Sequence, residues 1–138
     1  MVLALGVASA VRDSINRITV TPPFQKEYPM FLYEVNLYVQ KEHAASFLAW
    51  LDLHIKEMLS FDGFISAELW NREPDETLSD PKADLLWLSV HYRLDHRHNF
   101  ELYLEQHAER MREEGLRHFK GRFSADRRCY LQKKVYTI

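Results

Sequence analysis

The sequence has few of the residues that fix a fold by means other than side-chain packing, since its 138 residues include one cysteine, four glycines and five prolines. The single cysteine, Cys129, excludes an intramolecular disulfide and a cysteine-rich metal site, and it favours a reducing compartment. No apolar run approaches the roughly 18 residues that a membrane-spanning helix needs. We therefore expect a soluble, cytoplasmic protein.

The sequence also lacks a large excess of charge of one sign, because the formal net charge is −2 at pH 7. This balance disfavours a nucleic-acid-binding protein that relies on overall charge. Hydrophobic residues make up 46% of the chain and aromatic residues 13%, which is typical of a globular protein with aromatic side chains in its core. A chain of this length accommodates one domain of ordinary size.

The first 29 residues show no sustained helix or strand period. Pro22, Pro23 and Pro29 favour extended backbone and remove amide donors. We therefore predict an extended N-terminal arm over residues 1–29 and a folded domain over 30–138. Met30 stands directly before the first strong strand pattern, so an overextended gene start is an alternative interpretation of the arm.

Alternating apolar residues predict strands over 31–39, 64–72, 85–94 and 127–133. Apolar residues at helical spacing predict one helix over 42–60 and a second from an Asp95 N-cap to about Gly115, with a further short turn within 116–123. The order βαββαβ is that of a ferredoxin-like α+β fold, in which both helices cover one face of an antiparallel sheet.

Strand alternation assigns the side chains to the two faces of this sheet. The face toward the helices receives Val35, Leu37, Ile65, Ala67, Leu69, Leu86, Leu88 and Val90. The opposite face, which we call the open face, receives Glu34, Asn36, Tyr38, Ser66, Glu68, Trp70, Arg72, Trp87, Ser89, His91, Arg93, Arg128, Tyr130 and Gln132. Because large aromatic patches usually mark an interface or a binding site, we expect something to cover the open face.

Two coverings are physically sensible. Two copies can pack sheet against sheet as a homodimer and enclose a small-molecule cavity. Alternatively, the open sheet of a monomer can stack unpaired nucleic-acid bases on Tyr38, Trp70, Trp87 and Tyr130. The strand over 85–92 lacks the basic-Gly-aromatic arrangement of RNA-recognition domains, so we favour the homodimer.

His91 is the best acid/base candidate, because imidazole titrates near neutrality and Glu34 or Glu68 on the same face could orient it. Arg93 and Arg128 are candidates for substrate charge. The remaining candidate ligand-binding residues are Asn36, Tyr38, Trp70, Trp87 and Tyr130. A polar dimer interface is the simpler interpretation of the same residues, because sharing a face does not establish contact.

The other histidines and the cysteine favour structural roles. In the run Asp95–His98, the two histidines diverge by about 200° on a helix and neither has a partner one turn further on. No CxxCH motif is present, so we predict neither a metal nor a haem and assign no cofactor. His54 and His107 fit partly buried helix anchors, and strand parity points Cys129 toward the helices as a buried thiol.

Four strings of the sequence carry a family resemblance: Tyr33–Leu37, His54–Leu59 followed by Gly63 and Phe64, Tyr103–Ala108, and Arg112–Phe119 leading to Phe123. They resemble the family of small bacterial proteins called domain of unknown function 4286. The resemblance covers Met30 to Gln132 and implies a dimeric α/β barrel, but no established activity. Related barrels include monooxygenases, isomerases and ligand-sensing modules.

The residues and the resemblance together favour a protein that binds a small aromatic or anionic molecule between two sheets. An acid/base or monooxygenase-like enzyme and a non-catalytic sensing or protein-interaction module both remain open. Nucleic-acid binding is the less favoured alternative, and no feature indicates a membrane partner.

Overall fold

A four-stranded antiparallel sheet forms the centre of the computed structural model, which describes residues 17–21, 29–73 and 84–138. Its strands are β2 (Phe31–Val39), β3 (Phe64–Asn71), β4 (Leu86–Leu94) and β5 (Phe123–Leu131), in the order β3-β4-β2-β5. The central strands β2 and β4 pair along their whole length, from Phe31 opposite Leu94 to Val39 opposite Leu86. The predicted strand over 31–39 is confirmed to the residue.

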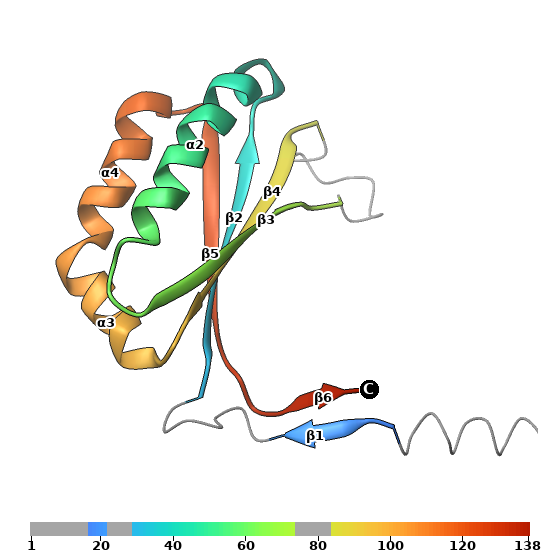
Figure 1. Ribbon diagram of the computed structural model, residues 1–138. Coiled ribbons are helices and arrows are strands. Elements are labelled where there is room, and N and C mark those ends of the chain that lie inside the picture. The colour runs from blue at the N-terminus through green and yellow to red at the C-terminus, as the bar shows by residue number, and fades with distance from the viewer. Residues whose placement is uncertain (1–16, 22–28, 74–83) are drawn as a thin grey trace, which may run out of the picture.

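Helices cover one face of this sheet (Figure 1). A short 3₁₀ turn, η1 (Lys41–His43), leads into α2 (Ala44–Met58), and α3 (Arg97–Gln106) and α4 (Ala108–Phe119) lie beside it. In α2 the apolar stripe buries Phe47, Leu51 and Met58 against the sheet. The element order and the single helical layer confirm the predicted ferredoxin-like α+β fold.

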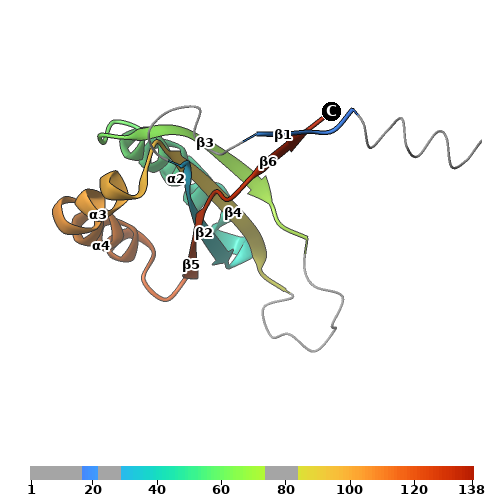
Figure 2. The same cartoon turned by 90° about the horizontal axis from the view of Figure 1, so that it is seen from below.

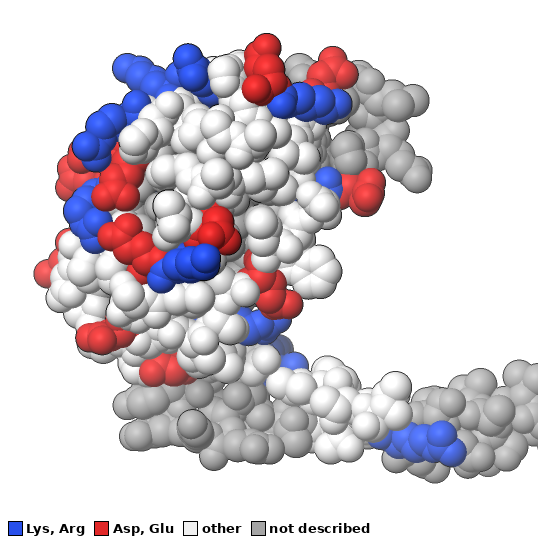
Figure 3. All heavy atoms as spheres, turned by 45° about the horizontal axis from the view of Figure 1, so that its top comes forward, with Lys and Arg blue, Asp and Glu red and all other residues white. Residues whose placement is uncertain are grey.

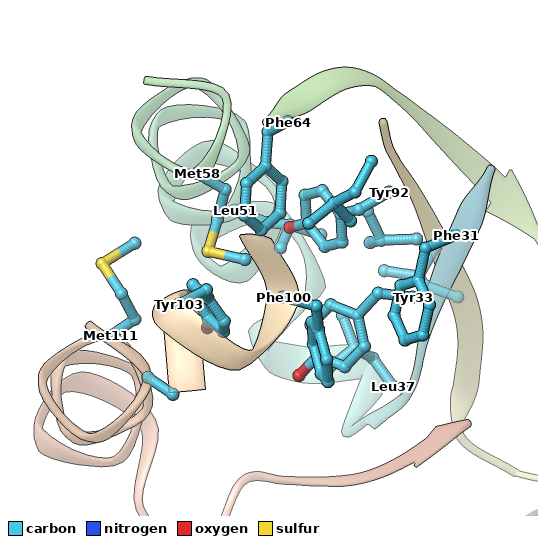
Figure 4. Packing of buried hydrophobic residues seen from close by; sticks show 14 of the residues in the cluster. Phe31, Tyr33, Leu37, Leu51, Met58, Phe64, Tyr92, Phe100, Tyr103 and Met111 are labelled. Carbon is cyan, nitrogen blue, oxygen red and sulfur yellow. The ribbon is translucent and has the colours of Figure 1, made fainter. Parts of the chain in front are cut away.

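The core between helices and sheet is built largely from aromatic rings (Figure 4). Tyr33 on β2 lies 5.9 Å from the ring of Tyr92 on β4 and 4.7 Å from the ring of Phe100 on α3. Burial raises the pKa of Tyr92 and of Tyr103, so both phenols stay protonated in this layer. Part of the aromatic excess therefore lies in the core.

The second predicted helix differs from the structure in three ways. Its N-cap is His96, whose Nδ1 accepts from the His98 amide at 3.1 Å, so the prediction of Asp95 as the cap is wrong by one residue. Asp95 instead accepts from the Asn99 side chain.

The helix also breaks at His107, whose ring stacks on Phe61 at 4.0 Å between centroids. Finally, α4 runs on to Phe119 through the predicted short turn.

Two side chains that were expected under the helices are exposed in the structure. Ile65 is the extra residue of a bulge between Phe64 and Ser66, which leaves its side chain exposed rather than under the helices. Cys129 has the expected parity, but β5 is an edge strand and the thiol is exposed. The strand β5 also begins at Phe123, four residues before the predicted start, because Phe123 and Ala125 pack against the core.

A second, two-stranded sheet pairs the two ends of the described chain. Strand β1 (Thr19–Thr21) runs antiparallel to β6 (Val135–Thr137), and neither strand was predicted. This small sheet lies at one end of the large one, on the side away from the helices (Figures 1 and 2). Within the described residues, no helix is both long and apolar enough to cross a membrane.

Candidate functional site

Strand register brings the polar side chains of the open face into rows across the sheet. Glu34 on β2 lies opposite His91 on β4 and Arg128 on β5, and His91 in turn lies opposite Glu68 on β3. The next row is formed by Trp70, Ser89, Asn36 and Asp126. The sheet therefore gathers the predicted acid/base residues in one row, with Trp70 in the row beside them.

Glu34 and His91 are in direct contact. The Nε2 atom of His91 lies 3.4 Å from Oε1 of Glu34 and 3.0 Å from Oγ of Ser89. Both side chains are largely buried, since 25% of His91 and 17% of Glu34 is exposed. A carboxylate at Nε2 favours the tautomer that carries its proton there, which leaves Nδ1 as a proton acceptor.

Glu68 has a different partner from the one its row suggests. Its Oε1 atom lies 3.2 Å from Nη2 of Arg93 and accepts a hydrogen bond from Nε of the same guanidinium. Both side chains of this pair are more exposed than Glu34 and His91. Of the two predicted orienting carboxylates, Glu34 is the one that contacts His91.

A chain of hydrogen bonds holds Glu34 in place from behind. The buried Asn36 amide donates to Oε2 of Glu34 and to Oδ1 of Asp126, both at 3.0 Å. Tyr38 donates to Oδ2 of Asp126 at 2.7 Å and accepts from Arg72 at 2.8 Å. Burial and the bond to Asp126 raise the pKa of Tyr38, so the phenol remains a donor.

Asp126 is a central residue of this chain that the sequence analysis missed. The predicted last strand began at Arg127, one residue too late to include it. Extending the alternation back to Phe123 would have placed Asp126 on the open face, two residues before Arg128. The alternation that identifies Asp126 was therefore present in the sequence, but the irregular stretch after α4 made the start of the strand difficult to locate.

The aromatic residues of the open face divide into a buried pair and an exposed pair. Tyr38 and Trp87 are 6% and 4% exposed and meet edge to face at 5.2 Å. The guanidinium of Arg72 lies 4.7 Å from the centroid of the Trp87 ring. Trp70 and Tyr130 are 51% and 44% exposed. Only the second pair is available to a ligand, because the first is packed beneath Arg72.

A hollow of about 340 Å³ lies among these side chains on the open face. It is lined by Glu34, Asn36, Trp70, Asn71, Arg72, Ser89, His91, Arg128 and Tyr130. The space-filling view shows the molecule hollowed on the side away from the helices (Figure 3). Of the predicted site residues, Glu68, Arg93, Tyr38 and Trp87 lie outside this lining.

The hollow offers a base, a cation and an aromatic wall. The ring of Trp70 lies 6.2 Å from the ring of His91. The hydrogen bond with Tyr130 and the nearby carboxylates Asp126 and Glu34 raise the pKa of Arg128, which stays a full cation. Over the described residues, no group of three or more His, Cys, Asp or Glu side chains is placed to hold a metal ion. The arrangement suits a small planar molecule with an anionic or hydroxyl substituent.

The chain matches one protein family in sequence and several solved structures in fold. A family described as "Domain of unknown function (DUF4286)" matches residues 30–133. A comparison with curated proteins gives no significant match. Several solved structures share the fold.

Three of these solved structures illustrate the likeness. A Deinococcus radiodurans protein that carries the name of an antibiotic biosynthesis monooxygenase is 16% identical, with a TM-score of 0.58 over 78% of this chain and 97% of that chain. A dimeric ferredoxin-like protein from an uncultured marine organism is 16% identical, with a TM-score of 0.54 over 75% and 94%. A single-site mutant of SnoaB, a cofactor-independent oxygenase from Streptomyces nogalater, is 16% identical, with a TM-score of 0.52 over 72% and 90%.

Proposed function

The chain belongs to the DUF4286 family, whose description names no activity, and we propose from the geometry of the hollow that it binds a small planar anion and transfers a proton to or from it. The observation that carries the proposal is the Glu34–His91 contact beside Trp70 and Arg128. In this arrangement Trp70 packs against the ligand plane and Arg128 pairs with its negative charge.

A second copy of the chain completes the site in this proposal. The hollow is open to solvent on the side away from the helices, and Trp70 and Tyr130 expose apolar surface around it. Packing two open faces together buries that surface and shields the ligand from water. The dimeric ferredoxin-like neighbour supports this pairing by analogy of fold.

The proton transfer uses Nδ1 of His91 as the base. Nδ1 takes a proton from an acidic C–H of the ligand, and the electron pair of that bond stays on the ligand as an anion. The resulting imidazolium is stabilised by Glu34 at Nε2, and Arg128 stabilises the ligand anion. The same proton returns to the ligand or leaves to water, so no cofactor is needed for this step.

An oxygenase reaction is a narrower form of the same proposal. SnoaB is described as a cofactor-independent oxygenase. In this form a ligand CH2 group that His91 deprotonates reacts with dioxygen as co-substrate, so that one oxygen atom becomes a ligand C=O group and the other leaves as water with the two hydrogens of the CH2 group. Oxygen uptake that depends on both a ligand and His91 would support this form, while proton exchange without oxygen uptake would restrict the function to acid/base chemistry.

The proposal is tested by ligand binding and by isotope exchange. The anionic aromatic probe 8-anilinonaphthalene-1-sulfonate is titrated against the intact protein, and aryl ketones that carry a carboxylate and a C–H next to the carbonyl are incubated in deuterium oxide and followed by NMR. We expect saturable binding, and Trp70→Ala and Arg128→Ala should each weaken it at least about tenfold. His91→Gln should abolish enzyme-dependent deuterium incorporation while leaving probe binding within a few-fold.

His98→Gln is the matched control, because His98 is exposed on α3 and takes no part in the hollow. Exchange that survives in His91→Gln contradicts the assignment of the base. Saturable binding with no exchange of any ligand contradicts proton transfer and leaves a non-catalytic binding module. The stacking platform for nucleic-acid bases is reduced by the burial of Tyr38 and Trp87, so a single-stranded oligonucleotide serves as a negative control.

A further inference from the structure

A second cavity, which we call the helix-side cavity, lies between the helices and the sheet. Its volume is about 50 Å³, and it is lined by residues of α2, α3 and α4 on one side and of β2, β4 and β5 on the other. Among the described residues, none lines both this cavity and the hollow of the open face. Binding in it is therefore independent of the function proposed above.

Contacts on two sides of this cavity set the distance between α2 and α4. Gly115 lets α4 approach Trp50 closely, since a Cβ atom at Gly115 would lie 3.1 Å from the Trp50 ring. About two turns further along α2, Glu57 accepts a hydrogen bond from Arg110 on α4 at 2.9 Å. His54 lies between these two contacts on α2 and lines the cavity. The helix packing therefore encloses the cavity on both sides.

Three polar groups in the wall have no hydrogen-bond partner among the residues that the structure describes. They are Nδ1 of His54 and the hydroxyls of the buried Tyr92 and Tyr103. Burial raises the pKa of both phenols, so each keeps a proton to donate. Because buried polar groups in folded proteins are normally paired, these groups indicate that a bound molecule completes the hydrogen bonding of the cavity.

Two arginines stand at the opening. Of the described residues in the wall, only Arg112 on α4 and Arg127 on β5 are exposed. Arg112 donates to the Tyr33 hydroxyl at 3.4 Å, and neither guanidinium forms an ion pair with a carboxylate of the described chain. Glu114, two residues beyond Arg112, pairs with Arg110 instead. The opening therefore carries two positive charges that are available to an anion.

The volume limits the size of that anion. A water molecule needs a cavity of about 10–15 Å³, and an engineered cavity of about 150 Å³ in another protein binds benzene. By proportion, the helix-side cavity holds about two or three non-hydrogen atoms. An aromatic ring does not fit, so the cavity suits a short chain rather than the planar ligand proposed for the hollow.

We propose that the helix-side cavity is a second binding site, which takes a short 2-hydroxycarboxylate such as lactate. The carboxylate lies at the opening between Arg112 and Arg127, where charge-assisted hydrogen bonds hold it. The hydroxyl group enters the cavity and pairs with the unsatisfied phenols, and the methyl group packs beside Met58 and Met111. In Figure 4 these two methionines extend from α2 and α4 into the space between the helices.

The methionine methyl groups report on binding at this site. The intact protein is labelled with carbon-13 in these methyls and titrated with lactate, with propionate, which lacks the hydroxyl, and with lactamide, which lacks the charge. Lactate should shift the NMR signals of Met58 and Met111 saturably and leave Met30, which lies outside the cavity, unchanged. The dissociation constant of lactate should be at least about fivefold lower than those of propionate and lactamide.

Substitutions separate the role of the charge from that of the hydroxyl. Arg127→Gln should weaken lactate binding at least about fivefold and leave lactamide binding unchanged. Arg117→Gln is the matched control, because Arg117 is exposed on α4 and does not line the cavity. Tyr103→Phe removes one hydroxyl from the wall and should bring the dissociation constants of lactate and propionate together.

Each part of the proposal has its own contrary result. The site itself is overturned if lactate causes no saturable shift of Met58 and Met111, or if it shifts Met30 equally. Equal affinity for lactate and lactamide contradicts the role of the arginines, and equal affinity for lactate and propionate contradicts the role of the hydroxyl. Because the signals come from the helix face, the result does not depend on whether a ligand binds in the hollow.

Discussion

The two faces of the large sheet are stabilised in different ways. The face under the helices is packed by apolar and aromatic side chains, such as Phe47 and Leu88, which are almost completely buried. The open face is organised by hydrogen bonds that run from Arg72 through Tyr38, Asp126 and Asn36 to Glu34. Packing holds the fold together without specifying chemistry, whereas the hydrogen-bonded chain fixes the direction of one carboxylate. The comparison locates stability on one face and the candidate chemistry on the other.

The largest effect on stability is expected from truncating the core on the helix face. Phe47 is fully buried and meets Trp50, Phe119 and Phe123 in ring contacts of 5.0 to 5.6 Å. Phe47→Ala should lower the free energy of unfolding by about 3–5 kcal/mol, measured by urea denaturation. A loss below about 1 kcal/mol would show that the helical layer is loosely packed, and it would contradict the assignment of stability to the helix face.

A smaller loss is expected from the hydrogen-bonded chain of the open face. Asp126→Ala leaves the buried Asn36 amide and the Tyr38 hydroxyl without this acceptor, which should cost about 1–3 kcal/mol of unfolding free energy. The same variant should also weaken proton transfer, because Glu34 loses its support. Thermal denaturation and deuterium incorporation together check the prediction, and an unchanged exchange rate would show that Glu34 is held by other contacts.

The helix face should also respond to pH through His54. Its ring lies 4.6 Å from the Trp50 ring between centroids, and its Nδ1 has no hydrogen-bond partner among the residues that the structure describes. Burial lowers its pKa below the ordinary 6.5. The unfolded chain therefore binds this proton more readily than the folded chain, so stability falls as the pH drops below about 6.5.

His54→Leu removes that titration, and urea denaturation at about pH 5 and about pH 8 measures its effect. Relative to the wild type, the variant should lose less stability on acidification. A parallel loss in both proteins would assign the acid sensitivity to other groups. Glu101→Gln, on the exposed surface of α3, serves as the control substitution.

The smallest stability effect is expected at the exposed ring beside the hollow. Trp70→Ala should change the free energy of unfolding of the monomer by less than about 1 kcal/mol, because half of the ring is already exposed. The same substitution should weaken probe binding, as described above. A large destabilisation would mean that Trp70 serves the fold rather than a ligand, and the division between the two faces would need revision.

Much of the fold followed from local sequence patterns. Alternation located β2 to the residue and placed β3 and β4 within one residue of their ends, because the period of a half-buried strand does not depend on its neighbours. The break at His107 was not predictable, since the apolar stripe continues through it and the ring of His107 stacks on Phe61, which comes from a distant part of the chain. The short strands β1 and β6 were missed because three residues carry too little pattern.

The candidate site could also be predicted only in part from local sequence patterns. The sequence by itself determined that Glu34, Glu68, His91 and Trp70 share the open face, because side-chain parity along a strand is a local property. Only the tertiary structure decided that Glu34 contacts His91 while Glu68 pairs with Arg93, and that Trp87 is buried while Trp70 is exposed. These choices depend on which side chains compete for one partner across neighbouring strands, and that competition exists only once the strands are paired.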